Sequence, residues 1–138
     1  MIDPLSHVNW FAVMLASTAH FLLGGIWFAG LVGERYAAAL GIADRPRQKL
    51  GPVFFVGPFV CGALTIATTA ILIHALGITT YGDGLALGAL VGLGYLVPMT
   101  VNIAINPLFP RPFYYALLNA PFFILASLLS CTILVALS

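Results

Sequence analysis

Four long apolar stretches alternate with three short polar connections along the chain. The stretches cover residues 8–32, 53–76, 84–105 and 113–137. A helix that crosses the hydrocarbon core of a bilayer needs about 20 predominantly apolar residues, and every stretch reaches that length. The pattern predicts an all-α fold, a polytopic transmembrane four-helix bundle that forms one domain over residues 1–138. An even number of crossings puts both termini on the same side of the membrane.

The ends of the stretches carry recognisable signals. Asn9 can cap the first helix, as Ser6 also could. Helix-compatible residues then continue the first span as far as Gly41, a typical helix terminator. The connection at residues 77–83 is so short that the second and third spans must be antiparallel neighbours. Proline interrupts the third span at position 98 and the fourth at position 121, so we expect kinks and freed carbonyl groups there.

Composition makes a soluble protein untenable. The chain is 62% hydrophobic and 7% charged, whereas soluble domains carry about 25% charged residues. Four spans nearly fill the length, so any function must lie inside the bundle, in its loops or on its lipid-facing surface. Trp10 and Trp27, near the two ends of the first span, suit the aromatic belts of a membrane protein. A basic face for nucleic acid is absent.

The basic residues are confined to the first and third connections. They are Arg35, Arg45, Arg47, Lys49 and Arg111. The positive-inside rule puts these connections in the cytoplasm, which in a bacterium means an inner-membrane protein with periplasmic termini. We interpret Arg45, Arg47 and Lys49 as an orientation signal that attracts anionic membrane lipid. The alternative is a docking site for an acidic partner.

Glycine recurs at every fourth position at the start of the third span. Gly84, Gly88 and Gly92 lie on one helix face. Membrane helices gain packing contacts when small residues let their backbones approach closely, so this face is predicted to pack against another helix. Two alternatives remain: packing within one chain, or association with a second copy.

A similar stripe on the first span contains the chain's only mid-membrane histidine. Ala12, Ala16, His20 and Gly24 follow at intervals of four. An ionisable residue at this depth is a candidate functional site. His20 can be a neutral residue hydrogen-bonded across a helix interface, a group that handles protons or substrate, or a haem or metal ligand. His74 lies at a different level along its own span, which disfavours bis-histidine haem.

Amides gather toward the third connection. Asn102 and Asn106 lie one turn apart, Tyr95 precedes them, and Asn119 lies at a comparable depth on the fourth span. Buried amides need hydrogen-bond partners, so we expect Asn102 and Asn119 to bond across the hairpin. The cluster is interpreted as structural contact between helices or, alternatively, as the lining of a polar cavity.

Signatures of catalysis and metal binding are missing from the sequence. It has no paired carboxylates within the spans, no glycine-rich phosphate loop, no His-Glu-x-x-His and no Cys-x-x-Cys. Cys61 and Cys131 are placed in opposite leaflets, so no disulfide is expected between them. We therefore expect no enzyme, no metal site and no cofactor, with haem or pigment binding at His20 or His74 as a minor alternative.

Three short segments resemble a known family. Val8-Asn9-Trp10, Gly24-Gly25-Ile26-Trp27, and Pro98 followed by Asn102 are similar to small bacterial membrane proteins catalogued as domain of unknown function 1761. The resemblance covers essentially the whole chain. It departs at Phe28, where tyrosine is expected, and at His20, where an apolar or small residue is expected. It implies the four-span architecture and no particular activity.

These observations lead to three functional hypotheses. The first is an accessory or assembly subunit that packs as a homo-oligomer or within a larger integral membrane complex. The second is a channel or carrier for a small neutral or weakly polar solute, lined by Asn102, Asn119 and His20. The third is a haem- or pigment-binding subunit. Any site is expected between the first, third and fourth spans.

Overall fold

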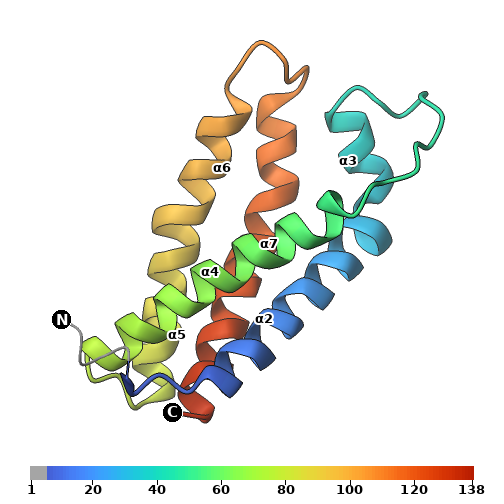
Figure 1. Ribbon diagram of the computed structural model, residues 1–138. Coiled ribbons are helices and arrows are strands. Elements are labelled where there is room, and N and C mark those ends of the chain that lie inside the picture. Colours follow the sequence, from blue (N-terminus) through green and yellow to red (C-terminus); the bar gives the residue numbers. More distant parts are fainter. Residues whose placement is uncertain (1–5) are drawn as a thin grey trace.

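The computed structural model describes residues 6–138, and these residues form a helical bundle (Figure 1). Within them, four helical segments are long and apolar enough to cross a membrane. They are Trp10–Leu31, Val53–Ala75, Tyr81–Ala104 and Pro112–Ala136. The prediction of an all-α, four-span transmembrane fold is confirmed.

The first span consists of α2 (Trp10–Gly25) followed by a π-helix, η1 (Ile26–Leu31). Asn9 caps α2, because its Oδ1 accepts hydrogen bonds from the backbone N–H groups of Phe11 and Ala12 at 3.1 and 3.2 Å. This satisfies two of the donors that a helix start leaves without partners.

The helical path then breaks before it reaches the first connection. Val32, with φ −119°, separates η1 from α3 (Gly33–Ala39), so the first span does not continue as one uninterrupted helix. Gly41 ends α3 as expected. Its φ is +69°, and the adjoining Ile42 N–H donates to the carbonyl oxygen of Ala37 at 3.0 Å, a pattern that favours glycine.

The second span is α4 (Val53–Ala75), and the third begins with α5 (Tyr81–Ala89). The third span therefore starts three residues before the predicted position 84. Thr80 caps α5: its Oγ1 accepts from the Asp83 N–H at 3.1 Å and donates to the Asp83 carboxylate at 2.7 Å. This reciprocal cap draws residues into the helix that the sequence suggested were part of a turn.

The third span changes its helical type at mid-length. After α5 it continues as a π-helix, η2 (Leu90–Leu96), and then as α6 (Val97–Ala104). The Val97 N–H donates to the Gly92 carbonyl, five residues earlier. Pro98 follows directly and cannot donate, so the wider turn accommodates the missing donor within the span.

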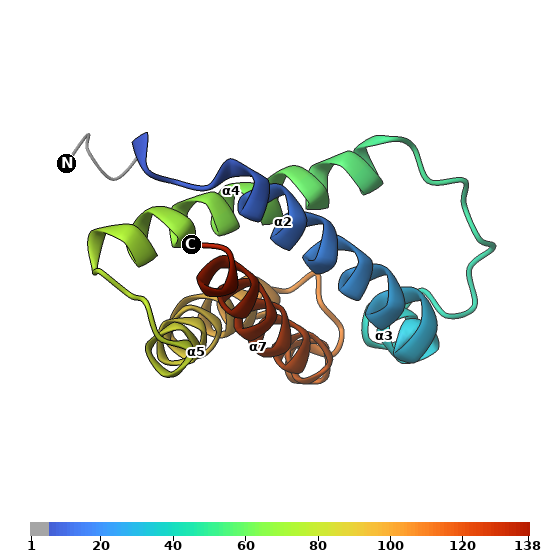
Figure 2. The same ribbon diagram turned by 90° about the horizontal axis from the view of Figure 1, so that it is seen from below.

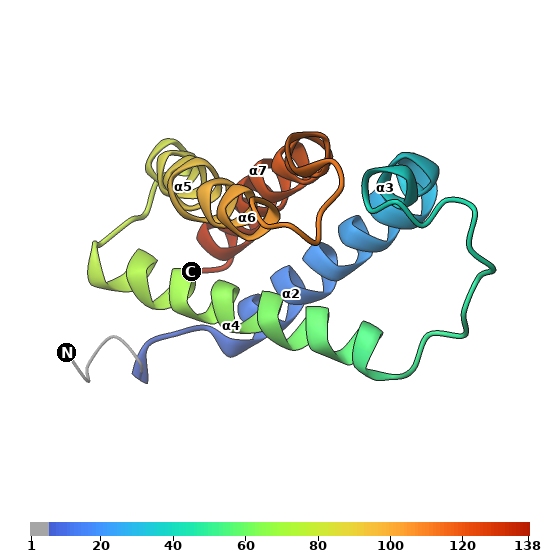
Figure 3. The same cartoon turned by 90° about the horizontal axis from the view of Figure 1, so that it is seen from above.

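The fourth span, α7 (Pro112–Ala136), is the centre of the bundle. It packs against α2 on one side and along α5, η2 and α6 on the other. Helix α4 crosses α2 at an inclination and makes a shorter contact with α7 (Figures 2 and 3).

Both ends of the described chain lie at one end of the bundle, and the first and third connections lie at the other (Figure 1). The Asn9 Nδ2 donates to the Leu137 carbonyl oxygen at 2.8 Å, which ties the beginning of α2 to the end of α7. We call these the terminal end and the loop end of the bundle.

Helix α7 covers the glycine face of the third span. A Cβ atom added at Gly88 would lie 3.0 Å from the Ser127 carbonyl oxygen, and one at Gly92 would lie 2.5 Å from the Ser127 Oγ. At Gly84 it would lie 2.7 Å from the Val135 Cγ2. Of the two alternatives for this face, the structure has packing within one chain.

The small residues of α2 also lie at internal contacts. Ala12 and Ala16 are buried in the larger of two apolar clusters, at the terminal end. Gly24 faces the Phe122 ring of α7, which a Cβ at that position would approach to 3.4 Å. The smaller cluster lies at the loop end, around Val32 and Leu118. The bundle core is therefore divided into two apolar parts.

Candidate functional site

His20 projects from the middle of α2 into the space between α4 and α7. A Cβ added at Gly62 of α4 would lie 3.2 Å from the imidazole Cδ2, so the absence of a side chain there makes room for the ring. Phe122 of α7 meets the ring edge to face, with 5.4 Å between centroids. The imidazole Nδ1 is buried and has no hydrogen-bond partner.

Ser130 on α7 is the second residue with an unsatisfied polar atom. Its side chain is 3% exposed, and its Oγ has no partner. Serine and threonine in apolar helices usually donate to a carbonyl of their own helix. Ser127 and Thr69 do so, at 3.0 and 2.8 Å. Ser130 does not, and its hydroxyl is therefore free to bond something else.

His20 and Ser130 line the same hollow, which we call the central cavity. Its other lining residues are Thr65, Ile66, Thr69, Val91, Leu96, Ser127 and Cys131. The cavity has about 10 Å³ available to the centre of a water-sized molecule, which is room for roughly one water molecule. Two residues that each have a buried polar atom without a partner thus line one small cavity.

The π-helix η2 forms one wall of the central cavity through Val91 and Leu96. A π-helical turn is wider than an α-turn and is often found at functional sites. Here it lies at the depth of His20, between the glycine-packed start of the third span and the segment after Pro98. The backbone irregularity of the third span therefore coincides with the unsatisfied polar groups.

The lining of the central cavity carries no aspartate, glutamate, lysine or arginine. Its polar groups are one imidazole, hydroxyl groups and a thiol. An ion in so apolar a surrounding would need an opposite charge close by. The chemistry of this lining therefore fits a neutral molecule that donates or accepts hydrogen bonds.

Aromatic rings fill the space between the central cavity and the loop end. Phe122 contacts Phe28 with 5.0 Å between centroids, Phe28 contacts Tyr36 at 5.1 Å, and Tyr36 contacts Tyr115 at 5.4 Å. Burial, together with the neighbouring Tyr115 hydroxyl, raises the pKa of Tyr36 well above its usual range. These four rings, which we call the aromatic plug, are therefore uncharged and fill this part of the bundle core.

Trp27 is partly buried and packs against the smaller apolar cluster at the loop end. Its place in an interfacial aromatic belt stays a prediction. Its Nε1–H donates to the Leu118 carbonyl oxygen of α7 at 3.0 Å. That carbonyl follows the Leu117 carbonyl, which lacks its helical donor because Pro121 has no N–H. The indole therefore ties η1 to the part of α7 that precedes Pro121.

The predicted amide cluster does not form. Asn102 is exposed, and Tyr95 is 74% exposed. Asn119 is buried, but it donates to the Tyr115 carbonyl oxygen of its own helix at 2.7 Å. Asn106 donates to the Ile103 carbonyl and accepts from the Leu108 N–H. The predicted Asn102–Asn119 bond was therefore wrong, because α6 turns Asn102 away from α7.

The basic residues of the first connection, Arg45, Arg47 and Lys49, are exposed. They lie in the loop between α3 and α4, at the same end of the bundle as Arg111 (Figure 1). The first and third connections, which carry the basic residues in the sequence, thus lie together at the loop end of the folded molecule.

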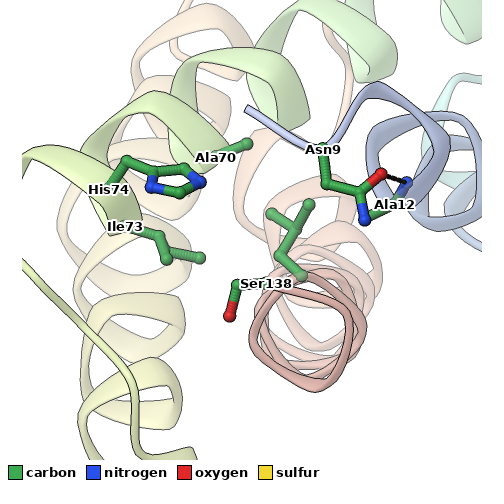
Figure 4. A pocket seen from close by; sticks show the side chains of 7 residues that line it. Asn9, Ala12, Ala70, Ile73, His74 and Ser138 are labelled. Carbon is green, nitrogen blue, oxygen red and sulfur yellow. Dashed lines mark hydrogen bonds between the residues drawn. The ribbon is translucent and has the colours of Figure 1, made fainter. Parts of the chain in front are cut away.

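A second hollow lies at the terminal end of the bundle (Figure 4). It is lined by Asn9, Ala12, Ala70, Ile73, His74, Leu134 and Ser138. Asn9 already bonds the start of α2 and the Leu137 carbonyl. The lining of this hollow has none of the unsatisfied buried atoms found at the central cavity, so it makes a weaker candidate site.

The two helix-borne histidines do not fit a haem. The space beside His20 holds about one water molecule, far less than a porphyrin requires. His20 meets α4 at Gly62, and His74 follows twelve residues later on that helix, roughly 18 Å away at 1.5 Å per residue. Among the described residues, no three histidine, cysteine, aspartate or glutamate side chains are placed to hold a metal ion.

Sequence reasoning found His20 and missed Ser130, Thr65 and Thr69. Hydroxyl residues in apolar helices are common and usually bond their own helix, so nothing marks one of them as unsatisfied. Position along the span was no uniform signal, since Thr65 lies near the middle of α4, as His20 does in its span, whereas Ser130 lies six residues from the end of α7. Cys131 also lines the cavity, and both cysteines are free, as predicted.

Comparison with known proteins gives a family and no function. The model of a family described as a protein of unknown function, DUF1761, matches residues 11–135. No curated protein matches the chain, and no solved structure does.

Proposed function

Because this chain belongs to the DUF1761 family of unknown function, we propose a role for it from its own geometry: a non-catalytic integral membrane protein that binds a small neutral hydrogen-bonding molecule in the central cavity. The observation that carries the proposal is that His20 and Ser130, whose Nδ1 and Oγ atoms are buried without hydrogen-bond partners, line the same cavity. The proposal keeps the neutral, weakly polar solute of the channel-or-carrier hypothesis and keeps His20, but replaces Asn102 and Asn119 by residues that line the central cavity.

Buried polar groups without hydrogen-bond partners lower the stability of a folded protein. A buried donor or acceptor without a partner costs about 1–3 kcal/mol. Two such atoms at one cavity represent stabilisation that a bound molecule could recover. A single water molecule would satisfy part of this demand. A ligand with one hydroxyl or carbonyl group could do the same while gaining apolar contacts with Ile66 and Val91.

Catalysis finds little support at this site. A serine nucleophile needs a histidine within hydrogen-bonding distance and a third group that orients the ring. Neither the Ser130 Oγ nor the His20 Nδ1 has any partner, so the two side chains are not bonded to each other. The lining also lacks a carboxylate that could orient His20.

The proposal is tested by histidine NMR on protein in lipid vesicles. With His7 and His74 replaced by glutamine, only His20 reports in ¹⁵N-histidine-labelled protein. The probe is 1-butanol, which dissolves in both water and lipid. We expect a saturable shift of the His20 signal, with affinity weakened about five- to tenfold in Ser130→Ala, as the loss of one hydrogen bond predicts.

Ser17→Ala is the matched control. Ser17 is equally buried, but its Oγ already donates to the Val13 carbonyl at 2.7 Å and does not line the cavity. Butanol binding should therefore be unchanged in that variant. A His20 signal that never saturates in the otherwise wild-type protein would overturn the proposal.

The accessory-subunit hypothesis loses its principal surface, because α7 already covers the glycine face. Other apolar surfaces are exposed, and the first turn of α4 is one of them. Val53, Phe54, Phe55 and Val56 are each more than half exposed, and four consecutive residues cover the whole circumference of a helix. Lipid or a partner could surround this turn. Sizing in mild detergent tests association, and a strictly monomeric particle would end that hypothesis.

A further inference from the structure

The central cavity lies between two closed ends. Toward the terminal end, the larger apolar cluster closes the bundle core, with Ala16, Ile66 and Cys131 next to the cavity. These three side chains are at most 2% exposed. Packed apolar side chains therefore separate the central cavity from the terminal end and from the hollow found there.

Toward the loop end, the aromatic plug closes the cavity. Phe122 contacts the His20 ring directly and contacts Phe28 behind it. Tyr36 and the buried Leu118 continue the same packing. An aqueous solute coming from the basic loops would have to displace several packed rings.

One flank of the cavity is not closed by helix packing. Thr65 and Thr69 of α4 and Val91 and Leu96 of η2 line the cavity from two sides, yet α4 packs on α2 and α7 and makes no extended contact with η2. Figures 2 and 3 show α4 inclined across the bundle, so that its loop end diverges from α6.

The exposure of the side chains along this flank also indicates that helix packing does not close it. Thr65 and Leu96 are only partly buried. Leu64, which precedes Thr65, is 64% exposed, and Leu93, three residues before Leu96, is 55% exposed. In a bilayer these exposed leucines would contact acyl chains. The cavity therefore borders the lipid between α4 and η2.

We infer that the central cavity takes its ligand laterally from the bilayer, and that the ligand is a lipid-dissolved neutral molecule with one hydroxyl or carbonyl group on a hydrocarbon chain. This inference rests on the proposed binding function. The oxygen bonds His20 and Ser130, and the chain lies between α4 and η2. A cavity with room for one water molecule accepts such a headgroup, while the open flank accepts the apolar remainder.

Photolabelling in phosphatidylcholine vesicles tests the route. The probe is a long-chain alcohol with a diazirine beside its hydroxyl group, and labelled residues are located by peptide mass spectrometry. We expect labelling of Thr65, Thr69 and Val91 that unlabelled 1-decanol displaces. Ser130→Ala should weaken the probe about five- to tenfold.

Two threonine variants distinguish loss of binding at the open flank from a general effect of replacing threonine by leucine on α4. Thr65→Leu enlarges a cavity-lining side chain at the flank and should abolish displaceable labelling. Thr68→Leu is the control, because Thr68 is exposed and outside the lining. Both hydroxyls donate to a carbonyl of their own helix, at 3.1 and 2.9 Å, so the two changes remove the same kind of bond.

The outcomes distinguish this inference from the proposed function. If butanol shifts the His20 signal but the long-chain alcohol gives only labelling that decanol does not displace, lateral access is wrong and the binding site stands. If neither probe binds saturably, both are overturned. Displacement by decanol is measured on wild-type protein, so the test does not depend on the folding of any variant.

Discussion

The close approach of the third and fourth spans depends on the absence of a Cβ atom at the glycine positions of their interface. At Gly88, the space for a Cβ is taken by the backbone of α7, with the Ser127 carbonyl oxygen at 3.0 Å and the Leu128 Cα at 3.1 Å. Backbone atoms cannot rotate away as a flexible side chain can. The absence of a side chain at this position is therefore a condition of the packing, as the glycine spacing suggested.

Gly88→Ala is accordingly expected to force the two helices apart and to lower the free energy of unfolding by about 1–3 kcal/mol. Gly94→Ala is the control, because a Cβ there would meet nothing within 4 Å. Unfolding in mixed micelles by SDS measures both variants. Equal stability of the two would contradict this account of the glycine face.

At the scale of helices, the prolines and π-helices determine where polar groups meet. Trp27 of η1 donates to the Leu118 carbonyl at 3.0 Å, beside the Leu117 carbonyl that lacks its helical donor because of Pro121. Pro98 follows η2, whose wide turn forms a wall of the central cavity. The sequence indicated that the prolines free carbonyls of their own helices, but it did not indicate that an indole would donate beside one of them.

Trp27→Phe should retain the ring and remove the donor, which leaves a partly buried carbonyl with one bond fewer. We expect a loss of about 1 kcal/mol in unfolding free energy. Trp10→Phe serves as the comparison, since Trp10 is 53% exposed at the start of α2. Thermal unfolding in detergent, followed by circular dichroism, gives both values. A larger effect at Trp10 than at Trp27 would refute this role of the indole.

Across the whole molecule, the positive charges and the ends of the described chain lie at opposite ends of the bundle. The basic residues of the first and third connections lie at the loop end, and both ends of the described chain lie at the terminal end. From the positive-inside rule we propose that the loop end faces the cytoplasm of a bacterial cell and the terminal end the periplasm.

Cysteine accessibility tests this orientation in a background where Cys61 and Cys131 are replaced by alanine. A membrane-impermeant maleimide added to spheroplasts should modify Tyr81→Cys, at the terminal end, and spare Lys49→Cys, at the loop end, until the membrane is permeabilised. Both parent side chains are exposed. The reverse pattern would invert the proposed topology.

The sequence alone determined the spans, the end of α3 at Gly41 and the glycine face, because hydrophobic length, glycine conformation and small-residue spacing act locally along a helix. It could not determine rotation and tilt, which arise when helices pack. The rotation of α6 left Asn102 exposed. The buried Asn119 side chain donates instead to the Tyr115 carbonyl of its own helix. Rotation and tilt also brought His20 and Ser130 to one cavity, and whether a buried hydroxyl finds a partner depends on neighbours that only the tertiary structure supplies.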